Sequence, residues 1–223
     1  MHAKQKVYDL LYESAIHQGL SGWGGDDRLA KGPEQVAHIL AQPYIPRTGK
    51  VLELGCGEGH LCRLLAQHGY DITGVDISSV AIHWANEKNA IHRTAIRYYH
   101  GDFSHADFQV FDHFDLIVDG NCFHCILGDS RPVFLKNAYA SLSENGIFFI
   151  SSLCSQDADN HIILRAGEPY RHVPTCNSLK DEVRHAGFDV LDVFIHKRMG
   201  YDHINLFLKK AEKNPALYQY YRQ

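Results

Sequence analysis

The most informative stretch of this 223-residue sequence is Val51-Leu52-Glu53-Leu54-Gly55-Cys56-Gly57-Glu58-Gly59. A short apolar run that contains one acidic residue leads directly into three glycines at every second position, and a segment of helical periodicity follows. Glycine lets the backbone turn sharply and approach a ligand closely, because it has no Cβ atom. In open α/β sheets, ligands bind beyond the carboxyl ends of the strands. The stretch therefore predicts a strand, a ligand-binding turn and a helix in an α/β sheet.

On either side of this stretch, short apolar runs alternate with helical segments, which is typical of a parallel sheet with helices on both faces. The predicted strands are 50–54, 71–76, 95–100, 114–119 and 146–153, and the predicted helices are 58–69, one that starts at Ser78, 129–142 and 179–186. Two further strands, 188–195 and 203–208, are joined by a link too short for a crossover helix. We therefore expect them to form an antiparallel pair at the sheet edge.

The spacing of the glycines separates two kinds of nucleotide site. A dinucleotide-binding turn of the form G-x-G-x-x-G would place glycine at position 60, where this sequence has His60. A phosphate-binding loop would need Gly-Lys-Ser/Thr, which does not occur after these glycines. The pattern E-x-G-x-G-x-G instead resembles the first motif of the class I S-adenosylmethionine-dependent methyltransferases.

This resemblance implies a Rossmann-like α/β sheet of seven strands, mostly parallel with an antiparallel edge strand, and S-adenosylmethionine as the cofactor. Asp76 closes the second strand, where a carboxylate would accept hydrogen bonds from both ribose hydroxyls. Asp102 closes the third strand and would reach the adenine amino group, with Phe103 against the ring. The segment 119–121 would meet the methionine part. The expected cofactor-binding residues are Trp23, Glu53, Gly55, Cys56, Gly57, Asp76, Ile77, Asp102, Phe103, Asp119, Gly120 and Asn121.

The resemblance covers residues 50–210, which leaves an N-terminal segment, 1–49, and a C-terminal tail, 211–223. We expect 1–49 to be helical pieces that cover the site as a lid, joined by the glycine-rich break at 21–25. Trp23, which lies between glycines, is either part of a hinged cover or an anchor to the core.

Residues 154–178 are polar and are expected to form an irregular insert after the fifth strand, of the kind that is often functional. The expected substrate residues are Tyr8 and Tyr12 in the lid and Arg165 and Tyr170 in the insert. Together with Glu168, Arg171 and His172, the insert residues favour a polar or anionic small substrate, and a solvated loop of mixed charge is the alternative.

The segment after the fourth strand, Cys122-Phe123-His124-Cys125, lies where the transferred methyl group is expected. His124 is the candidate catalytic residue, as a general base. A nucleophilic role for Cys122 lacks the Pro-Cys pair of the cytosine methyltransferases, and a zinc site at Cys122, His124 and Cys125 lacks an evident fourth ligand. In the remaining interpretation, the two cysteines are apolar fillers and His124 is a hydrogen-bonded wall residue. We expect no metal.

Composition limits the classes of partner. Lys and Arg number 22 against 26 Asp and Glu, and the net charge of −4 does not favour nucleic acid as a partner. No apolar run is long enough for a membrane helix, and no secretory signal is visible, so we expect a cytoplasmic protein with free thiols. The expected function is methyl transfer to an N, O or S atom of a small-molecule acceptor, by a monomer or homodimer. The alternatives are a non-catalytic protein that binds S-adenosylmethionine, and a methyltransferase that acts on RNA or protein.

Overall fold

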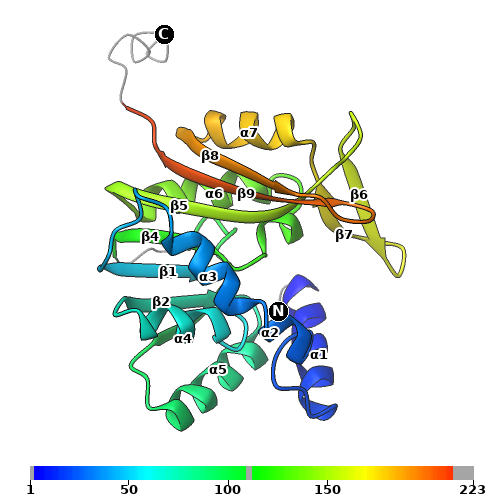
Figure 1. Cartoon of the computed structure of the whole chain (residues 1–223). Helices are drawn as coiled ribbons and strands as arrows, with labels where there is room; N and C mark the ends of the chain where they lie inside the picture. Colours follow the sequence, from blue (N-terminus) through cyan, green and yellow to red (C-terminus); the bar gives the residue numbers. More distant parts are fainter. Residues whose placement is uncertain (1–2, 109–111, 213–223) are drawn as a thin grey trace.

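A computed structural model describes residues 3–108 and 112–212, which form one seven-stranded sheet with helices around it (Figure 1). The strand order is β3-β2-β1-β4-β5-β9-β8. Neighbours from β3 to β5 are parallel, and β9 runs antiparallel to both β5 and β8. The bounds are β1 Lys50–Leu54, β2 Asp71–Asp76, β3 Arg97–His100, β4 Phe114–Asp119, β5 Leu142–Cys154, β8 Phe188–His196 and β9 Asp202–Lys210. The predicted mostly parallel sheet with an antiparallel edge pair is confirmed, and β9 lies inside β8.

The helices lie on both faces of the sheet, as predicted. Successive residues of a strand point to opposite faces, and in β4 Ile117 belongs to one apolar core while Leu116 and Val118 belong to the other. α6 (Ser130–Ser141) and α7 (Cys176–His185) supply the first core, and α3 (Gly32–Leu40), α4 (His60–Gln67) and α5 (Ser79–His92) contribute to the second. Because both faces are buried, the strands read as continuous apolar runs.

Local signals set the helix starts that position the site. Gly59 caps α4 in a left-handed conformation, so this helix begins at His60 rather than at Glu58. Ser78 caps α5 as expected, because its hydroxyl accepts a hydrogen bond from the Ala81 amide. Both helices therefore begin directly after the carboxyl ends of β1 and β2.

The insert at 154–178 is not irregular, so that expectation was wrong. β6 (His161–Arg165) and β7 (Glu168–Val173) form an antiparallel hairpin in which Arg165 pairs with Glu168. The two residues of its turn, Ala166 and Gly167, both have positive φ, as a tight two-residue hairpin turn requires. Much of the hairpin is exposed, so its sequence lacks the alternation of apolar and polar residues that marks a half-buried strand. For this reason the two strands were not predicted from the sequence.

The N-terminal segment is helical, as predicted. It contains α1 (Ala3–His17), α2 (Asp26–Leu29) and α3, with the glycine-rich break between α1 and α2. Figure 1 places α1 and α2 near the start of α5, beside the ends of β1 and β2. Of the predicted tail at 211–223, residues from 213 onward lie outside the described part. None of the helices described is long and apolar enough to cross a membrane.

Candidate active site

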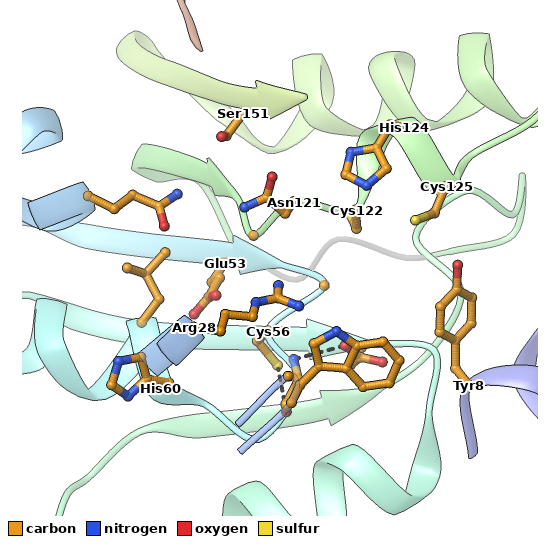
Figure 2. Close-up of a pocket in the computed structure, with 18 of the residues that line it drawn as sticks. Tyr8, Arg28, Glu53, Cys56, His60, Asn121, Cys122, His124, Cys125 and Ser151 are labelled. Carbon is orange, nitrogen blue, oxygen red and sulfur yellow. Dashed lines mark hydrogen bonds between the residues drawn. The ribbon is translucent and has the colours of Figure 1, made fainter. Parts of the chain in front are cut away.

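A cavity of about 750 Å³ lies at the carboxyl ends of the central strands (Figure 2). Its lining residues come from five parts of the chain: the N-terminal helices, the turns after β1 to β4, the end of β5, the β6–β7 hairpin, and β8 and β9 with their connection. All of the expected cofactor, substrate and catalytic residues line this cavity except Asp119 and Arg165, and of the other insert residues named from the sequence only Arg171 does. Segments far apart in sequence therefore meet at one site.

The glycine-rich turn forms the floor of the cavity. Gly57 has a φ of +57°, and a Cβ atom there would lie 2.6 Å from the hydroxyl of Tyr12. Gly55 has a φ of +67°, and a Cβ atom there would lie 2.5 Å from the Cβ of Cys122. Both positions therefore need glycine, for the backbone conformation and for the close approach of neighbouring segments.

Asp76 ties this turn to the end of β2. One carboxylate oxygen accepts a hydrogen bond from the Gly57 amide at 2.8 Å, and the other accepts one from the Ser78 amide at 2.8 Å. Burial raises the pKa of Asp76 to about 6, although these two amides act in the opposite direction. An ionised carboxylate has about four acceptor positions, so two remain for other donors.

Glu53 lies below the turn, inside β1, and is 3% exposed. Burial raises its pKa to about 8. Its Oε2 atom has no hydrogen-bond partner within the part of the chain that the structure describes. Such a group is suited to a cationic ligand, which would replace the lost hydration.

Asp102 and Phe103 follow β3 and differ in burial. Asp102 is half-buried, and its Oδ1 accepts hydrogen bonds from the amide and hydroxyl of Ser104. Phe103 is 6% exposed and packs edge-on against Phe134, with ring centroids 5.3 Å apart. Both residues line the same part of the cavity wall.

Asp119 has a different position from the one expected. It is fully buried behind the cavity wall, where its Oδ1 accepts hydrogen bonds from the amides of Cys122 and Phe123. It thereby holds the turn that leads into η1 (Phe123–Cys125). Gly120 and Asn121, its successors, do line the cavity, and Asn121 has a left-handed φ of +69°.

His124 lies on η1 and faces the cavity from the side opposite to the glycine-rich turn (Figure 2). It is 5% exposed, and its Nδ1 has no hydrogen-bond partner among the described residues. Burial, with Arg171 as the next cause, lowers the pKa of His124 to about 3. The imidazole is therefore neutral at physiological pH, and its low pKa makes it a weak general base.

The two cysteines beside His124 are protonated thiols. Burial raises the pKa of both Cys122 and Cys125, which disfavours the thiolate needed by a nucleophile or a metal. Within residues 3–108 and 112–212, no group of three His, Cys, Asp or Glu side chains is arranged to hold a metal ion.

The N-terminal segment covers the cavity through aromatic contacts. The rings of Tyr12 and Trp23 lie 4.6 Å apart, and those of Tyr8 and Trp23 lie 6.4 Å apart. Asp9, on α1, accepts hydrogen bonds from the Ser78 hydroxyl at 2.7 Å and from the Val80 amide at 3.3 Å. A carboxylate at the start of α5 is stabilised by the helix dipole, so α1 is held over the turn.

Of the two arginines that the sequence analysis named in the insert, the hairpin brings only Arg171 to the cavity. Tyr170 and Arg171 of β7 line the cavity, whereas Arg165 is exposed at the hairpin tip and does not. No specific sequence signal marks the other cavity residues from distant segments. These are Arg28 of α2, His38 of α3, His196 of β8, Arg198 of the β8–β9 connection, and His203 and Asn205 of β9.

Comparison with known proteins identifies the family. Residues 28–193 match the family model described as a methyltransferase domain. An uncharacterised methyltransferase of Schizosaccharomyces pombe is 33% identical over 99 residues, which are 44% of this chain and 68% of that protein. The eEF1A lysine and N-terminal methyltransferase of Mus musculus is 31% identical over 127 residues, which are 55% of this chain but 18% of that larger protein.

Among solved structures, the fold resembles the 1,6-didemethyltoxoflavin-N1-methyltransferase of Burkholderia thailandensis, which contains 1,6-didemethyltoxoflavin and S-adenosylhomocysteine. The TM-score is 0.72 at 20% identity, and the match covers 95% of this chain and 92% of that one. The chain therefore belongs to the methyltransferase domain family, and it is an S-adenosylmethionine-dependent methyltransferase with the class I fold.

Proposed function

We propose that this enzyme transfers a methyl group to an N, O or S atom of a small-molecule acceptor. The observation that carries this proposal is the wall of the cavity opposite the glycine-rich turn. This wall combines α1 and α2, the β6–β7 hairpin and β9 around one cavity of about 750 Å³. Ligand pockets for small molecules have volumes of about 300–1,000 Å³. A cavity covered from three directions favours a small acceptor, because the entire molecule must fit inside the cavity.

The residues at the ends of β1, β2 and β3 fit the cofactor. Gly55 and Gly57 leave space for close approach of a ligand to the backbone, and Asp76 keeps two acceptor positions for ribose hydroxyls. Asp102 and Phe103 supply an acceptor and an apolar ring for adenine. Asp119 is proposed to act indirectly, by holding the turn that carries Gly120 and Asn121.

Two charged residues fit the zwitterionic methionine part of the cofactor. The unpartnered Oε2 of Glu53 would face its ammonium group, which compensates the buried carboxylate. Arg28 of α2 lines the same cavity as Glu53 (Figure 2), and it would bind the carboxylate. Trp23 and Tyr12 then cover this part from the solvent side.

When bound, S-adenosylmethionine supplies an electrophilic methyl group on its sulfonium. The protein's task is to align the acceptor with it and to exclude water, because alignment lowers the barrier without further chemistry. We assign His124 the role of hydrogen-bond partner of the acceptor, because its neutral imidazole and unpartnered Nδ1 suit binding better than proton removal. Tyr8, whose pKa is raised by burial, stays a neutral hydroxyl on the same wall.

An enzyme that methylates RNA or protein is the competing function, since relatives of the family include the mouse enzyme that modifies eEF1A. The net charge of −4 disfavours an RNA partner. The acceptor class can be determined without knowing the acceptor. A cell extract is separated by ultrafiltration into small-molecule and macromolecular fractions, and each is incubated with the enzyme and S-adenosylmethionine labelled on the methyl group.

We expect label in the small-molecule fraction, and no label with Asp76→Ala, which removes the proposed ribose acceptor. Asp71→Ala, at the exposed opposite end of β2, is the matched control and should label as the wild type does. Label that appears in protein or RNA, and depends on Asp76, would replace the proposed acceptor class.

A further inference from the structure

Outside the N-terminal segment, which contributes Asp27, Arg28, Lys31 and Glu34, the charges that line the cavity are separated in space. Four acidic residues lie at the end of β1, in the turn after it and at the ends of β2 and β3: Glu53, Glu58, Asp76 and Asp102. On the opposite side, the described lining residues of β5, β7, β8, β9 and the β8–β9 connection include no Asp or Glu. They include Arg171 and Arg198 instead. The side of the cavity left for the acceptor is therefore electropositive.

Arg171 is the central cation of this side. It lies two residues before Val173, which is fully buried, and alternation along β7 puts both residues on the same face of the hairpin. The hairpin is fixed at its base, where the Ser155 amide donates to the Pro174 carbonyl and the Thr175 amide donates to Asn160 Oδ1. Arg171 is thus held in place over the cavity rather than on a free loop.

The guanidinium of Arg171 has no acidic partner among the described residues. Its Nε atom is buried without a hydrogen-bond partner, and the group is bounded by the Tyr170 ring, 4.9 Å from its central carbon, and by the Cys125 thiol. Neither neighbour carries a compensating charge. Arg171 is half-buried, and withdrawing part of a cation from water without a counter-ion costs free energy, which points to a counter-ion that a ligand would supply.

Arg131, an arginine with a structural role, has hydrogen-bond partners that Arg171 lacks. Arg131 is 4% exposed, and its Nε and Nη2 atoms each lie 2.7 Å from a carboxylate oxygen of Glu182. Its Nη1 donates to the carbonyls of Phe123 and Ile126. Every side of this guanidinium is satisfied by protein, in contrast to that of Arg171.

Neutral hydrogen-bonding groups surround the Arg171 side of the cavity. His124 Nδ1, Asn121 Oδ1 and Asn205 Oδ1 are buried without partners in the described structure. Burial also lowers the pKa of His203 to about 4, so this residue is uncharged and Arg171 and Arg198 carry the positive charge. In the tautomer protonated at Nδ1, His124 is a neutral donor to an oxyanion, whereas Asn121 Oδ1 and Asn205 Oδ1 are acceptors and would receive N–H or O–H groups of the same ligand.

We propose that the methyl acceptor bears an oxyanion, a carboxylate or a phosphate, and that Arg171 binds it with His124 as a neutral neighbouring donor. The proposal rests on the proposed function, because it names the class of small molecule that this site would take. The planar guanidinium can donate two parallel hydrogen bonds to either oxyanion. Arg171 thereby selects acceptors by charge, and the uncharged atom to be methylated is directed toward the cofactor side.

The test uses direct binding, so it does not require the acceptor to be known. Calorimetry on the protein loaded with S-adenosylhomocysteine measures the affinity of benzoate, inorganic phosphate and neutral benzamide at constant ionic strength. We expect benzoate or phosphate to bind at least about tenfold more tightly than benzamide, and comparison of the two anions distinguishes a carboxylate from a phosphate acceptor. Anions that bind no better than benzamide would overturn the proposal.

Variants of the hairpin locate the effect. Arg171→Gln should weaken anion binding by about 10- to 100-fold. Arg171→Lys keeps the positive charge but loses the paired N–H donors of the planar guanidinium, so its anion affinity should lie between those of the wild type and Arg171→Gln. Arg165→Gln is the matched control, because Arg165 contacts the same Tyr170 ring from outside the cavity and should have no effect. Equal anion binding by Arg171→Gln and the wild type would refute the assignment.

Affinity for S-adenosylhomocysteine separates the two proposals. If this affinity is normal in all variants and only anion binding fails, the anionic acceptor is excluded, while the proposed small-molecule methyl transfer is still decided by the labelling of the ultrafiltered fractions. If S-adenosylhomocysteine itself does not bind, the proposed function fails. The anion titrations on the unloaded protein then still show whether Arg171 is an anion site.

Discussion

Replacing Asp76 with asparagine is expected to weaken cofactor binding at neutral pH and to remove one component of its pH dependence. The carboxylate of Asp76 already accepts the Gly57 and Ser78 amides, and its two remaining acceptor positions are the ones proposed for ribose. Hydrogen bonds to a charged group contribute about 1.5–3 kcal/mol each. Loss of one such bond raises the Kd about 10- to 100-fold at pH 7.5.

The sign of the pH effect follows from the pKa of Asp76, which burial raises to about 6. The ionised carboxylate is the form that accepts the ribose hydroxyls, so below pH 6 a proton must first leave. Each pH unit below the pKa then raises the wild-type Kd about tenfold, and the change from pH 7.5 to pH 5.0 is also about tenfold. The Asp76→Asn protein lacks this titration. The ratio of the variant Kd to the wild-type Kd should therefore fall about tenfold over this range.

Calorimetric titration with S-adenosylhomocysteine at several pH values measures this ratio. Because the charge of Asp76 is one of the causes that raise the pKa of Glu53 to about 8, the ratio is also measured in the Glu53→Gln background, where this second titration is absent. Asp71→Asn is the control: Asp71 lies at the other end of β2, exposed and paired with Arg97. A ratio that stays constant between pH 7.5 and pH 5.0 would refute the assignment of Asp76 as the titrating ribose ligand.

Three further variants test the glycine-rich turn, the histidine and the core. Gly57→Ala and Gly69→Ala each place a Cβ atom at positive φ, which should lower the free energy of thermal unfolding by about 1–2 kcal/mol. Only the Cβ of Gly57→Ala meets a neighbour within 4 Å, so only this variant should lose cofactor affinity in calorimetry. Similar affinities of both would contradict the role of Gly57. His124→Asn should lower kcat less than about tenfold, because an imidazole with a pKa of about 3 is a weak base. A loss in kcat of about 10²-fold or more, with a changed pH profile, would restore the hypothesis that His124 is a general base. Arg131→Met should destabilise the protein by about 3–5 kcal/mol in urea unfolding, since it leaves Glu182 and two carbonyls unpaired, and Glu182→Gln should cost less.

The cofactor side of the site was predictable because its signals are local. A glycine triplet after an apolar run predicts a turn with positive φ, and acidic residues at the ends of β2 and β3 share one sheet edge once the strands are parallel. Asp76 and Asp102 were located in this way. Asp119 obeys the same rule but points behind the wall, because it caps η1, and a 3-10 turn of three residues leaves little trace in the sequence.

The acceptor side was less predictable because long-range pairing creates it. β9 inserts between β5 and β8, which brings His203 and Asn205 next to the end of β5, and no sequence periodicity encodes that order. Arg165 and Arg171 have the same chemistry and lie in one hairpin. The turn at Ala166 and Gly167 and the register shift between Ile163 and Leu164 together set the pairing in which Arg171 faces the cavity and Arg165 faces solvent.

The position of β9 also has a consequence for the order of folding during synthesis. Residues 50–119 contain β1 to β4 and every acidic residue proposed to bind cofactor, so the cofactor half of the sheet can assemble as it leaves the ribosome, before the rest is made. β5 follows with one edge unpaired, and that edge is closed only when Phe207 reaches Phe149. An apolar strand with an open edge is prone to pair with other chains. During the interval between synthesis of β5 and synthesis of β9, this open edge is therefore where the nascent protein can pair with other chains.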